Sequence, residues 1–292
     1  MRNGDYLFAS NHGVIKVDKR KLEQSIDRSR IITVDAVNVL RKSLTPEFNP
    51  IAETDDGHLF IGTSNGLYEF FTKSMQVEKL NFSSKGEDLS QRIRTLLAAP
   101  GGQLWIGTDL GIFVYDYKKK KPLLLNTIIN NRTDIAEDYI SEMEYDSSGL
   151  IWIGTNTGLF KYEIKTKLLT PTSLKNTHVT TIEFGSANDL WIGTFNGLYK
   201  FNTVQHSFLW FNKSDGLLSS SFFETGSCRL SNGMLVFCGN TGINYFDPDS
   251  ISTGMVPLPL LITDFEINFK SVFNDTTSYY RQLRNSLFSN QV

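Results

Sequence analysis

The sequence is dominated by a repeat of the form [LI]-[FW]-I-G-T, followed after two further residues by G-[LI]. Four close copies begin at residues 59, 104, 151 and 190, and two degenerate copies occupy 7–18 and 235–247. The second glycine of each copy recurs at a mean spacing near 46 residues, whereas a turn residue precedes it by nine positions in all six copies. A constant step inside a variable period indicates a fixed hairpin joined by variable loops.

Each unit predicts four short antiparallel strands. Aromatic and β-branched residues alternate with Gly, Asn and Asp turns, and the fourth segment is the most polar. This pattern is typical of a β-propeller blade, so the fold class is all-β. The expected blade repeats lie near residues 4–50, 51–90, 91–138, 139–177, 178–216 and 217–250.

Two positions of the repeat indicate how the strands and blades pack, because one always holds a small residue and the other holds a large ring in the four close copies. The glycine of I-G-T is replaced only by small residues in the degenerate copies, Ala9 and Cys238, so we expect little room for a side chain there. Large rings, namely Phe60, Trp105, Trp152 and Trp191, stand at one position of the four close copies. We expect these rings to fill the space between neighbouring blades.

Composition excludes several classes of protein. The chain has 29 Lys and Arg against 31 Asp and Glu, a net charge of −2, which argues against a nucleic-acid partner. No apolar run approaches the roughly 18–20 residues of a transmembrane helix. The first residues carry no apolar signal-peptide segment.

No catalytic, metal or cofactor site is expected. The four histidines are scattered, and the two cysteines, Cys228 and Cys238, exclude a cysteine-rich zinc site, although they could pair across a hairpin. The sequence contains no G-x-S-x-G, H-E-x-x-H, P-loop or G-x-G-x-x-G motif. We expect no acidic residue to recur at an inward-facing repeat position.

The repeat resembles the two-component regulator propeller repeat, roughly D-x-x-G-x-L-W-I-G-T-x-x-G-L-x-x-[FY]. The segments DGLLSSSF (215–222) and FCGNTGINYFDP (237–248) look like the last blade of that family, and PLPLLITDFEIN (257–268) is similar to the first strand of its immunoglobulin-like Y_Y_Y module. The resemblance implies about six blade repeats over 1–254, belonging to a seven-bladed ring. The truncated start of the immunoglobulin-like module would follow over 255–292.

The resemblance also implies a function. These propellers form the periplasmic sensor region of Bacteroidetes hybrid two-component systems, which are homodimers in the inner membrane. They recognise carbohydrate or oligosaccharide and pass the signal to a histidine kinase, whose sequence is absent from this chain. We therefore expect a non-enzymatic sensor fragment. The alternatives are a structural or protein-interaction propeller without a small ligand and, third, a propeller lyase or hydrolase.

The turns between the second and third strands are expected to line one mouth of the propeller as a collar. Amides and hydroxyls match sugar hydroxyls as paired donors and acceptors, and a ring can stack on a sugar; the alternative is that these residues are simply good turn formers. Arg132, in the long polar loop 126–137, is a candidate contact for an acidic sugar, or part of a solvated loop. The candidate collar residues are Asn11, His12, Asn65, Asp109, Asn156, Thr157, Phe195, Asn196 and Asn240.

Overall fold

The computed structural model describes most of the repeat region. The described residues are 6–10, 13–17, 36–37, 50–71, 74, 76–80, 91–124, 135, 138–185, 188–251, 266–267 and 270–271, and side chains are described for 50–121 and 135–251 within these ranges. The chain divides into two compact units, Met1–Ser250 and Ile251–Val292. Antiparallel strands dominate the first unit, which also contains the 3-10 turn η4 (Lys213–Asp215).

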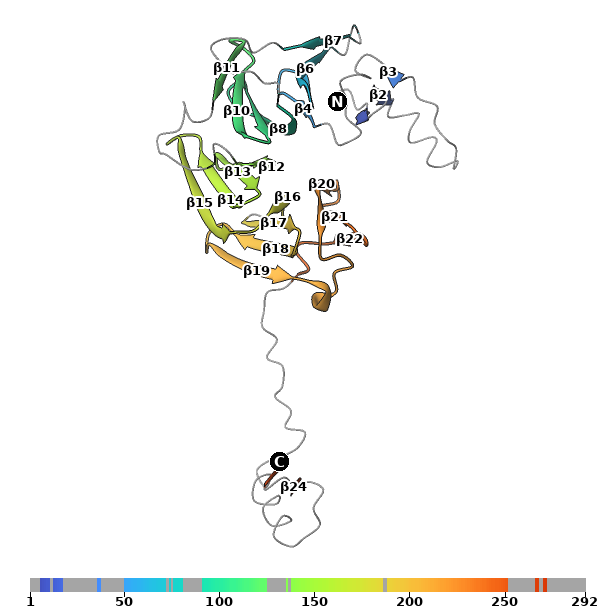
Figure 1. The fold of residues 1–292 in the computed structure, drawn as a ribbon, viewed down its shortest axis with the longest axis vertical. Coiled ribbons are helices and arrows are strands. Elements are labelled where there is room, and N and C mark those ends of the chain that lie inside the picture. The colour runs from blue at the N-terminus through green and yellow to red at the C-terminus, as the bar shows by residue number, and fades with distance from the viewer. Residues whose placement is uncertain are drawn as a thin grey trace. The chain divides into compact units, whose positions relative to one another are not determined.

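Five antiparallel sheets follow one another along the chain and form the blades of a propeller (Figure 1). Each sheet is a simple meander in which neighbours in sequence are neighbours in space. The strands are β4 (Ile51–Glu53), β5 (Leu59–Thr63), β6 (Gly66–Phe71) and β7 (Gln76–Lys79); β8 (Ile93–Ala99), β9 (Gln103–Thr108), β10 (Gly111–Asp116) and β11 (Lys121–Leu124); β12 (Ile140–Tyr145), β13 (Leu150–Thr155), β14 (Gly158–Glu163) and β15 (Leu168–Lys175); β16 (Val179–Phe184), β17 (Asp189–Thr194), β18 (Gly197–Asn202) and β19 (Ser207–Phe211); and β20 (Phe222–Arg229), β21 (Leu235–Gly239) and β22 (Gly242–Phe246).

The first strand of each blade lies on the inside. Strand β8 packs against β12, β12 against β16, and β16 against β20, and β12 also reaches β20 across the middle. Side chains on these inner strands therefore converge from several blades.

The blade count differs from the prediction. All six repeats form the predicted hairpin, and in the first it consists of β1 (Tyr6–Ser10) and β2 (Gly13–Val17). That hairpin belongs to a separate sheet with the two-residue strand β3 (Ala36–Val37). The described residues form five blades rather than about six of seven, because the motif specifies only the hairpin, whereas a blade also needs an inner strand packed on its neighbour.

The second unit is described only as a hairpin. Strands β23 (Glu266–Ile267) and β24 (Lys270–Ser271) pair with each other. No immunoglobulin-like strands are shown by these few residues, so that module stays a prediction.

The rings at the repeated aromatic position pack between blades, as predicted. Phe60, Trp105, Trp152 and Trp191 are at most 1% exposed. Each contacts a ring on the third strand of the following blade, with centroid distances between 4.8 and 6.2 Å; the pairs are Phe60–Tyr115, Trp105–Tyr162, Trp152–Phe201 and Trp191–Phe246.

The small residue of I-G-T is explained by the same crowding. A Cβ atom added at Gly154 would lie 2.5 Å from Cγ1 of Val179, the first residue of the next inner strand. At Gly107 it would lie 2.7 Å from Cγ2 of Ile140. Glycine is therefore required because the second strand of one blade touches the inner strand of the next.

Two glycines with positive φ, one between β4 and β5 and one in a collar turn, make a matched test of crowding at the turns. Gly57 (φ +90°) has open space where the methyl group of an alanine would stand, whereas at Gly197 (φ +102°) an added Cβ atom would meet Nε1 of Trp210 and lie 2.5 Å from the Phe211 carbonyl oxygen. We expect Gly57→Ala to cost about 1–2 kcal/mol in unfolding free energy and Gly197→Ala roughly 2–5 kcal/mol. Chemical denaturation measures both, and equal losses would contradict the crowding argument.

The suggested disulfide is not formed. Cys228 and Cys238 are free thiols. The register places Cys228 opposite Val236, so Cys238 lies two residues further along β21 rather than directly across.

Candidate functional site

The collar turns are held by the threonine of each I-G-T segment. The hydroxyl groups of Thr63, Thr108, Thr155 and Thr194 each donate to the carbonyl of the glycine three residues later, at 2.8–3.1 Å. Each also accepts the backbone N–H two residues on, at 3.0–3.1 Å. These threonine contacts close the turns, so the two side chains between each threonine and the following glycine are not needed to hold the turn. This weakens the interpretation that the collar residues are turn formers alone.

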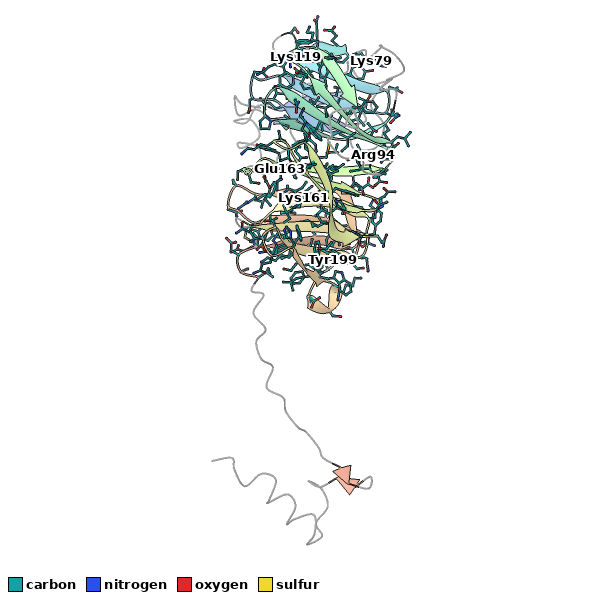
Figure 2. The ribbon with its side chains drawn as sticks, turned by 90° about the vertical axis from the view of Figure 1, so that its left-hand side faces the viewer. Lys79, Arg94, Lys119, Lys161, Glu163 and Tyr199 are labelled. Carbon is teal, nitrogen blue, oxygen red and sulfur yellow. The ribbon has the colours of Figure 1, made fainter. Side chains whose placement is uncertain are left out.

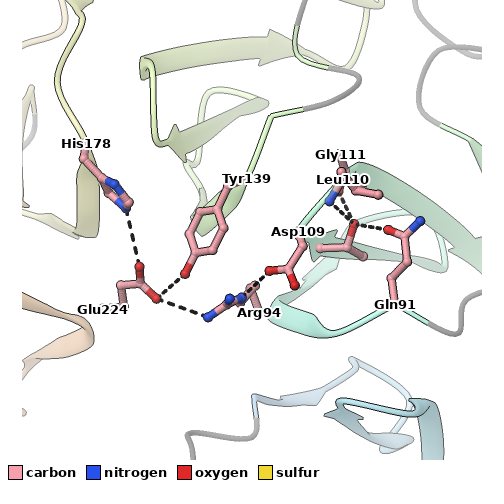
Figure 3. A network of polar contacts seen from close by, with 9 residues as sticks. Gln91, Arg94, Asp109, Leu110, Gly111, Tyr139, His178 and Glu224 are labelled. Carbon is pink, nitrogen blue, oxygen red and sulfur yellow. Dashed lines mark hydrogen bonds and ion pairs between the residues drawn. The ribbon is translucent and has the colours of Figure 1, made fainter.

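An ionic network lies at the collar end of the inner strands (Figure 3). Nε of Arg94 lies 2.6 Å from Oδ1 of Asp109, and NH1 of Arg94 lies 3.6 Å from Oε2 of Glu224. The Tyr139 hydroxyl donates to the same Glu224 oxygen, and Nε2 of His178 lies 3.4 Å from the other. Four blades thus contribute to one network, which is centred on Glu224.

Aromatic rings accompany the network. The Arg94 guanidinium lies 4.4 Å above the centre of the Tyr139 ring. The Tyr139 ring lies 5.6 Å from that of His178, and His178 lies 4.5 Å from Phe195. Phe195 is 51% exposed. A row of rings therefore ends at an exposed phenyl group beside the charged cluster.

Local irregularity of the inner strands positions these side chains. The pairing register shifts at the collar end of β8, β12, β16 and β20, between Ile93 and Thr95, for example, and between Phe222 and Ser227. A bulge of this kind re-aims a side chain and is frequent next to functional sites. Arg94 is the extra residue of β8, and Glu224 lies within the shifted stretch of β20.

The network sets the ionisation of its members. Burial alone would raise the pKa of Glu224, but the contacts from His178 and Tyr139 and the charge of Arg94 hold that pKa below its usual value. Burial and the neighbouring Glu224 raise the pKa of the Tyr139 hydroxyl. Glu224 is therefore an anion at neutral pH, and Tyr139 is a neutral donor.

The structure brings together two of the predicted collar residues, Asp109 and Phe195. Thr157 donates to Oδ2 of Asp138 at 2.6 Å, and Asn240 accepts from the Ser219 hydroxyl at 2.6 Å, so both are held in local contacts. The carbonyl of Asn196 accepts from the Trp210 indole. The remaining candidates stand apart from the network or outside the described residues: Asn65 is exposed on the first blade and Asn156 is exposed on the third, whereas Asn11, His12 and Arg132 fall in undescribed stretches.

Four members of the network, namely Arg94, Tyr139, His178 and Glu224, were not predicted from the sequence. All lie at the start of an inner strand. Tyr139 and His178 share one repeat position, directly before the first residue of the inner strand, and this spacing was the available signal. Arg94 lies in the bulge of β8 and Glu224 in the longer shifted stretch of β20, so the same spacing does not mark them.

The prediction about inward-facing acidic residues is wrong. Glu144 and Glu183 pair with Trp152 and Trp191, and they therefore occupy equivalent positions of consecutive blades. Together with Glu142, they interact across the inner strands. Burial raises the pKa of Glu142 to about 7 and that of Glu144 to about 8, and the neighbouring carboxylates reinforce both shifts.

Hydroxyl groups hold two of these inner-strand carboxylates, Glu142 and Glu183, in place. Thr95 donates to Oε1 of Glu142 at 3.0 Å, and Ser227 donates to Oε1 of Glu183 at 2.8 Å. Within the described ranges, no group of three or more His, Cys, Asp and Glu residues could hold a metal ion. The same residues contain no helix long and apolar enough to cross a membrane.

No protein-family model matches the chain, and no curated protein matches it. Its fold is similar to several solved structures. The extracellular domain of a hybrid two-component system of B. thetaiotaomicron aligns with 84% of this chain at 17% identity and a TM-score of 0.66. PorZ, a surface component of the type-IX secretion system of Porphyromonas gingivalis, aligns with 84% at 15% identity and a TM-score of 0.65, and a streptogramin B lyase aligns with 68% at 15% identity and a TM-score of 0.51.

These likenesses establish the propeller fold. The aligned part spans 31% of the B. thetaiotaomicron domain, 37% of PorZ and 68% of the lyase. The first of them agrees with the family that the repeat motif resembles. Because the three proteins have different functions, the fold by itself does not select among a sensor, a surface component and an enzyme.

Proposed function

We propose that this chain is the propeller of an extracytoplasmic sensor and that it binds a carbohydrate at the collar. The observation that carries the proposal is the exposed Phe195 ring, which lies next to His178 and the Glu224 network. Sugars present apolar C–H faces and rings of hydroxyl groups, so an exposed ring beside fixed charges suits them. The fold agrees with this role because a sensor extracellular domain is among its structural neighbours.

The network offers both hydrogen-bonding partners. Asp109 and Glu224 can accept from sugar hydroxyls, and Arg94 can donate. Mutual contacts hold these groups in place before a ligand arrives, which lowers the entropy lost on binding. Phe195 would then stack on one face of the sugar.

Signalling follows if binding favours one arrangement of subunits over another. We propose that the protein acts as a homodimer at the inner membrane, with the propeller in the periplasm and a histidine kinase beyond it. The propeller itself performs no catalysis in this proposal.

The test is calorimetric titration of the whole chain with a panel of oligosaccharides. For a glycan that binds, Phe195→Ala is expected to weaken affinity roughly ten-fold or more, since a buried aromatic contact contributes about 1–3 kcal/mol. Phe71→Ala is the matched control, because Phe71 is also an exposed phenylalanine, at 39%, and ends β6 in the one blade that contributes no residue to the network. Equal losses in both variants, or none in either, would exclude the collar as the binding site.

Two other functions would give different results. A protein-interaction propeller, which the likeness to PorZ favours, would show no glycan binding but would bind a protein through an exposed face. A lyase is the third candidate, because the fold is similar to that of a streptogramin B lyase, and it would release a product from its substrate. Product analysis after incubation with the same glycan panel separates the enzyme from the sensor.

A further inference from the structure

A cavity opens at the end of the inner strands opposite the collar. Its volume is about 610 Å³, within the range of small-molecule sites. It lies among the turns that join strands one and two of the third and fourth blades and the turn that joins strands three and four of the fourth blade, beside the end of β20. In Figure 2, Lys119 and Glu163, which belong to turns of this kind or border them, lie on one side of the molecule, and Arg94 at the collar lies on the other.

Three consecutive blades supply equivalent residues to this cavity. Tyr145, Phe184 and Arg229 each end an inner strand, and they pair with Ile151, Leu190 and Leu235 at the same repeat position. All three line the cavity. The propeller arrangement therefore places two aromatic rings and a guanidinium group around one space.

Arg229 is held in position while keeping donors available. Its NH1 atom donates to the carbonyl oxygens of Phe184 and Gly185, at 3.4 and 3.1 Å. A guanidinium has five N–H donors in a planar fork, so most of them remain for a ligand. The backbone anchors fix the side chain without neutralising its charge.

The two carboxylates in the cavity wall are already compensated. Asp146 accepts from the backbone and hydroxyl of Ser148, from the Leu150 N–H and from the Trp152 indole. Oδ2 of Asp189 lies 3.0 Å from Nζ of Lys200. Arg229 is therefore the charged group of the wall best placed to select a ligand, and it selects an anion.

The repeat pattern breaks at this cavity. The second residue of the turn between strands three and four is Lys118 in the second blade and Lys165 in the third, but Val204 in the fourth. Val204 lines the cavity and is 66% exposed. An apolar residue where the other turns carry lysine extends the apolar wall that Leu150 and Leu190 form.

We infer that this cavity is a second ligand site, which takes a small organic carboxylate bearing an apolar ring. The ring lies against Tyr145, Phe184 and Val204, and the carboxylate pairs with the Arg229 fork, which favours bidentate contacts with carboxylates. The site is separate from the collar and does not depend on the proposed sensor function.

The inference is tested with three probes on the whole chain by calorimetry. Phenylacetate carries both ring and charge, phenylacetamide carries the ring alone, and acetate carries the charge alone. We expect phenylacetate to bind at least ten-fold more tightly than either of the others. Arg229→Gln should weaken phenylacetate roughly ten- to hundred-fold, because a hydrogen bond to a charged group is lost.

Two further variants complete the design. Lys213→Gln removes an exposed positive charge from η4 and should leave phenylacetate binding unchanged. Val204→Glu places a negative charge on the exposed rim of the cavity and should weaken phenylacetate binding at least ten-fold. If Arg229→Gln fails to fold, the Val204→Glu variant by itself tests the inference. The inference is overturned if phenylacetate does not bind, if it binds no better than phenylacetamide, or if its affinity survives the changes at both 229 and 204.

Discussion

Replacing Trp152 with alanine is expected to lower the free energy of unfolding by about 3–5 kcal/mol. Trp152 is 1% exposed, packs against Phe201 of the next blade with a centroid distance of 5.6 Å, and donates from Nε1 to Oδ2 of Asp146 at 2.9 Å. The change therefore opens a cavity between two blades and removes one of the donors to a partly buried carboxylate. Chemical denaturation followed by circular dichroism measures the loss.

Trp210 provides the matched control because it is 48% exposed on the outer strand β19. Trp210→Ala removes a hydrogen bond to the Asn196 carbonyl and should cost only about 1 kcal/mol. Trp152→Phe helps to separate the two contributions at the buried site, since it loses the indole donor but keeps most of the ring that packs against Phe201. A loss at Trp152 no larger than that at Trp210 would contradict the role of these rings as inter-blade packing.

The stability of the protein is expected to fall as the pH rises from about 5 to about 8. The pKa values of Glu142 and Glu144 are raised by burial from 4.5 to about 7 and about 8, so in this window the folded protein binds more protons than the unfolded chain. The free energy of unfolding then decreases by about 1.4 kcal/mol per pH unit for each proton that the folded protein holds and the unfolded chain does not. The decrease ends above the pKa values of the two groups in the folded protein. Thermal unfolding midpoints between pH 5 and pH 9 measure the effect.

Glu144→Gln should flatten this dependence and make the protein more stable than the unmodified chain at pH 8. Glu78→Gln is the control, because it makes the same chemical change at an exposed position on the outer strand β7. Below about pH 4.5 the sign reverses, since the pKa values of Glu224 and Asp146 are lowered and their contribution disappears as they protonate. An unmodified chain that gains stability between pH 5 and pH 8 would show that the inner carboxylates are not desolvated.

The sequence by itself predicted the parts of the fold that depend on local chemistry. The turn glycines and asparagines fixed the six hairpins, and the ring at Trp152 and its equivalents identified the surface between blades. Both predictions rest on short-range patterns, in which a residue's role follows from its neighbours along the chain. The candidate collar positions Asp109 and Phe195 followed from the same reasoning, because each lies in a turn whose place in the blade is set by the hairpin.

Only the tertiary structure decided how the inner strands meet. Bulges at the collar end of β8 and β20 bring Arg94 and Glu224 from blades far apart in the sequence into one network, and the inner strands bring Glu144 close to Glu183. The number of blades was decided in the same way, since five inner strands pack in succession although six hairpins form. The physical reason is that hairpin formation is governed by local turn chemistry, whereas strand packing and side-chain convergence depend on contacts between distant segments, whose register a local motif does not specify.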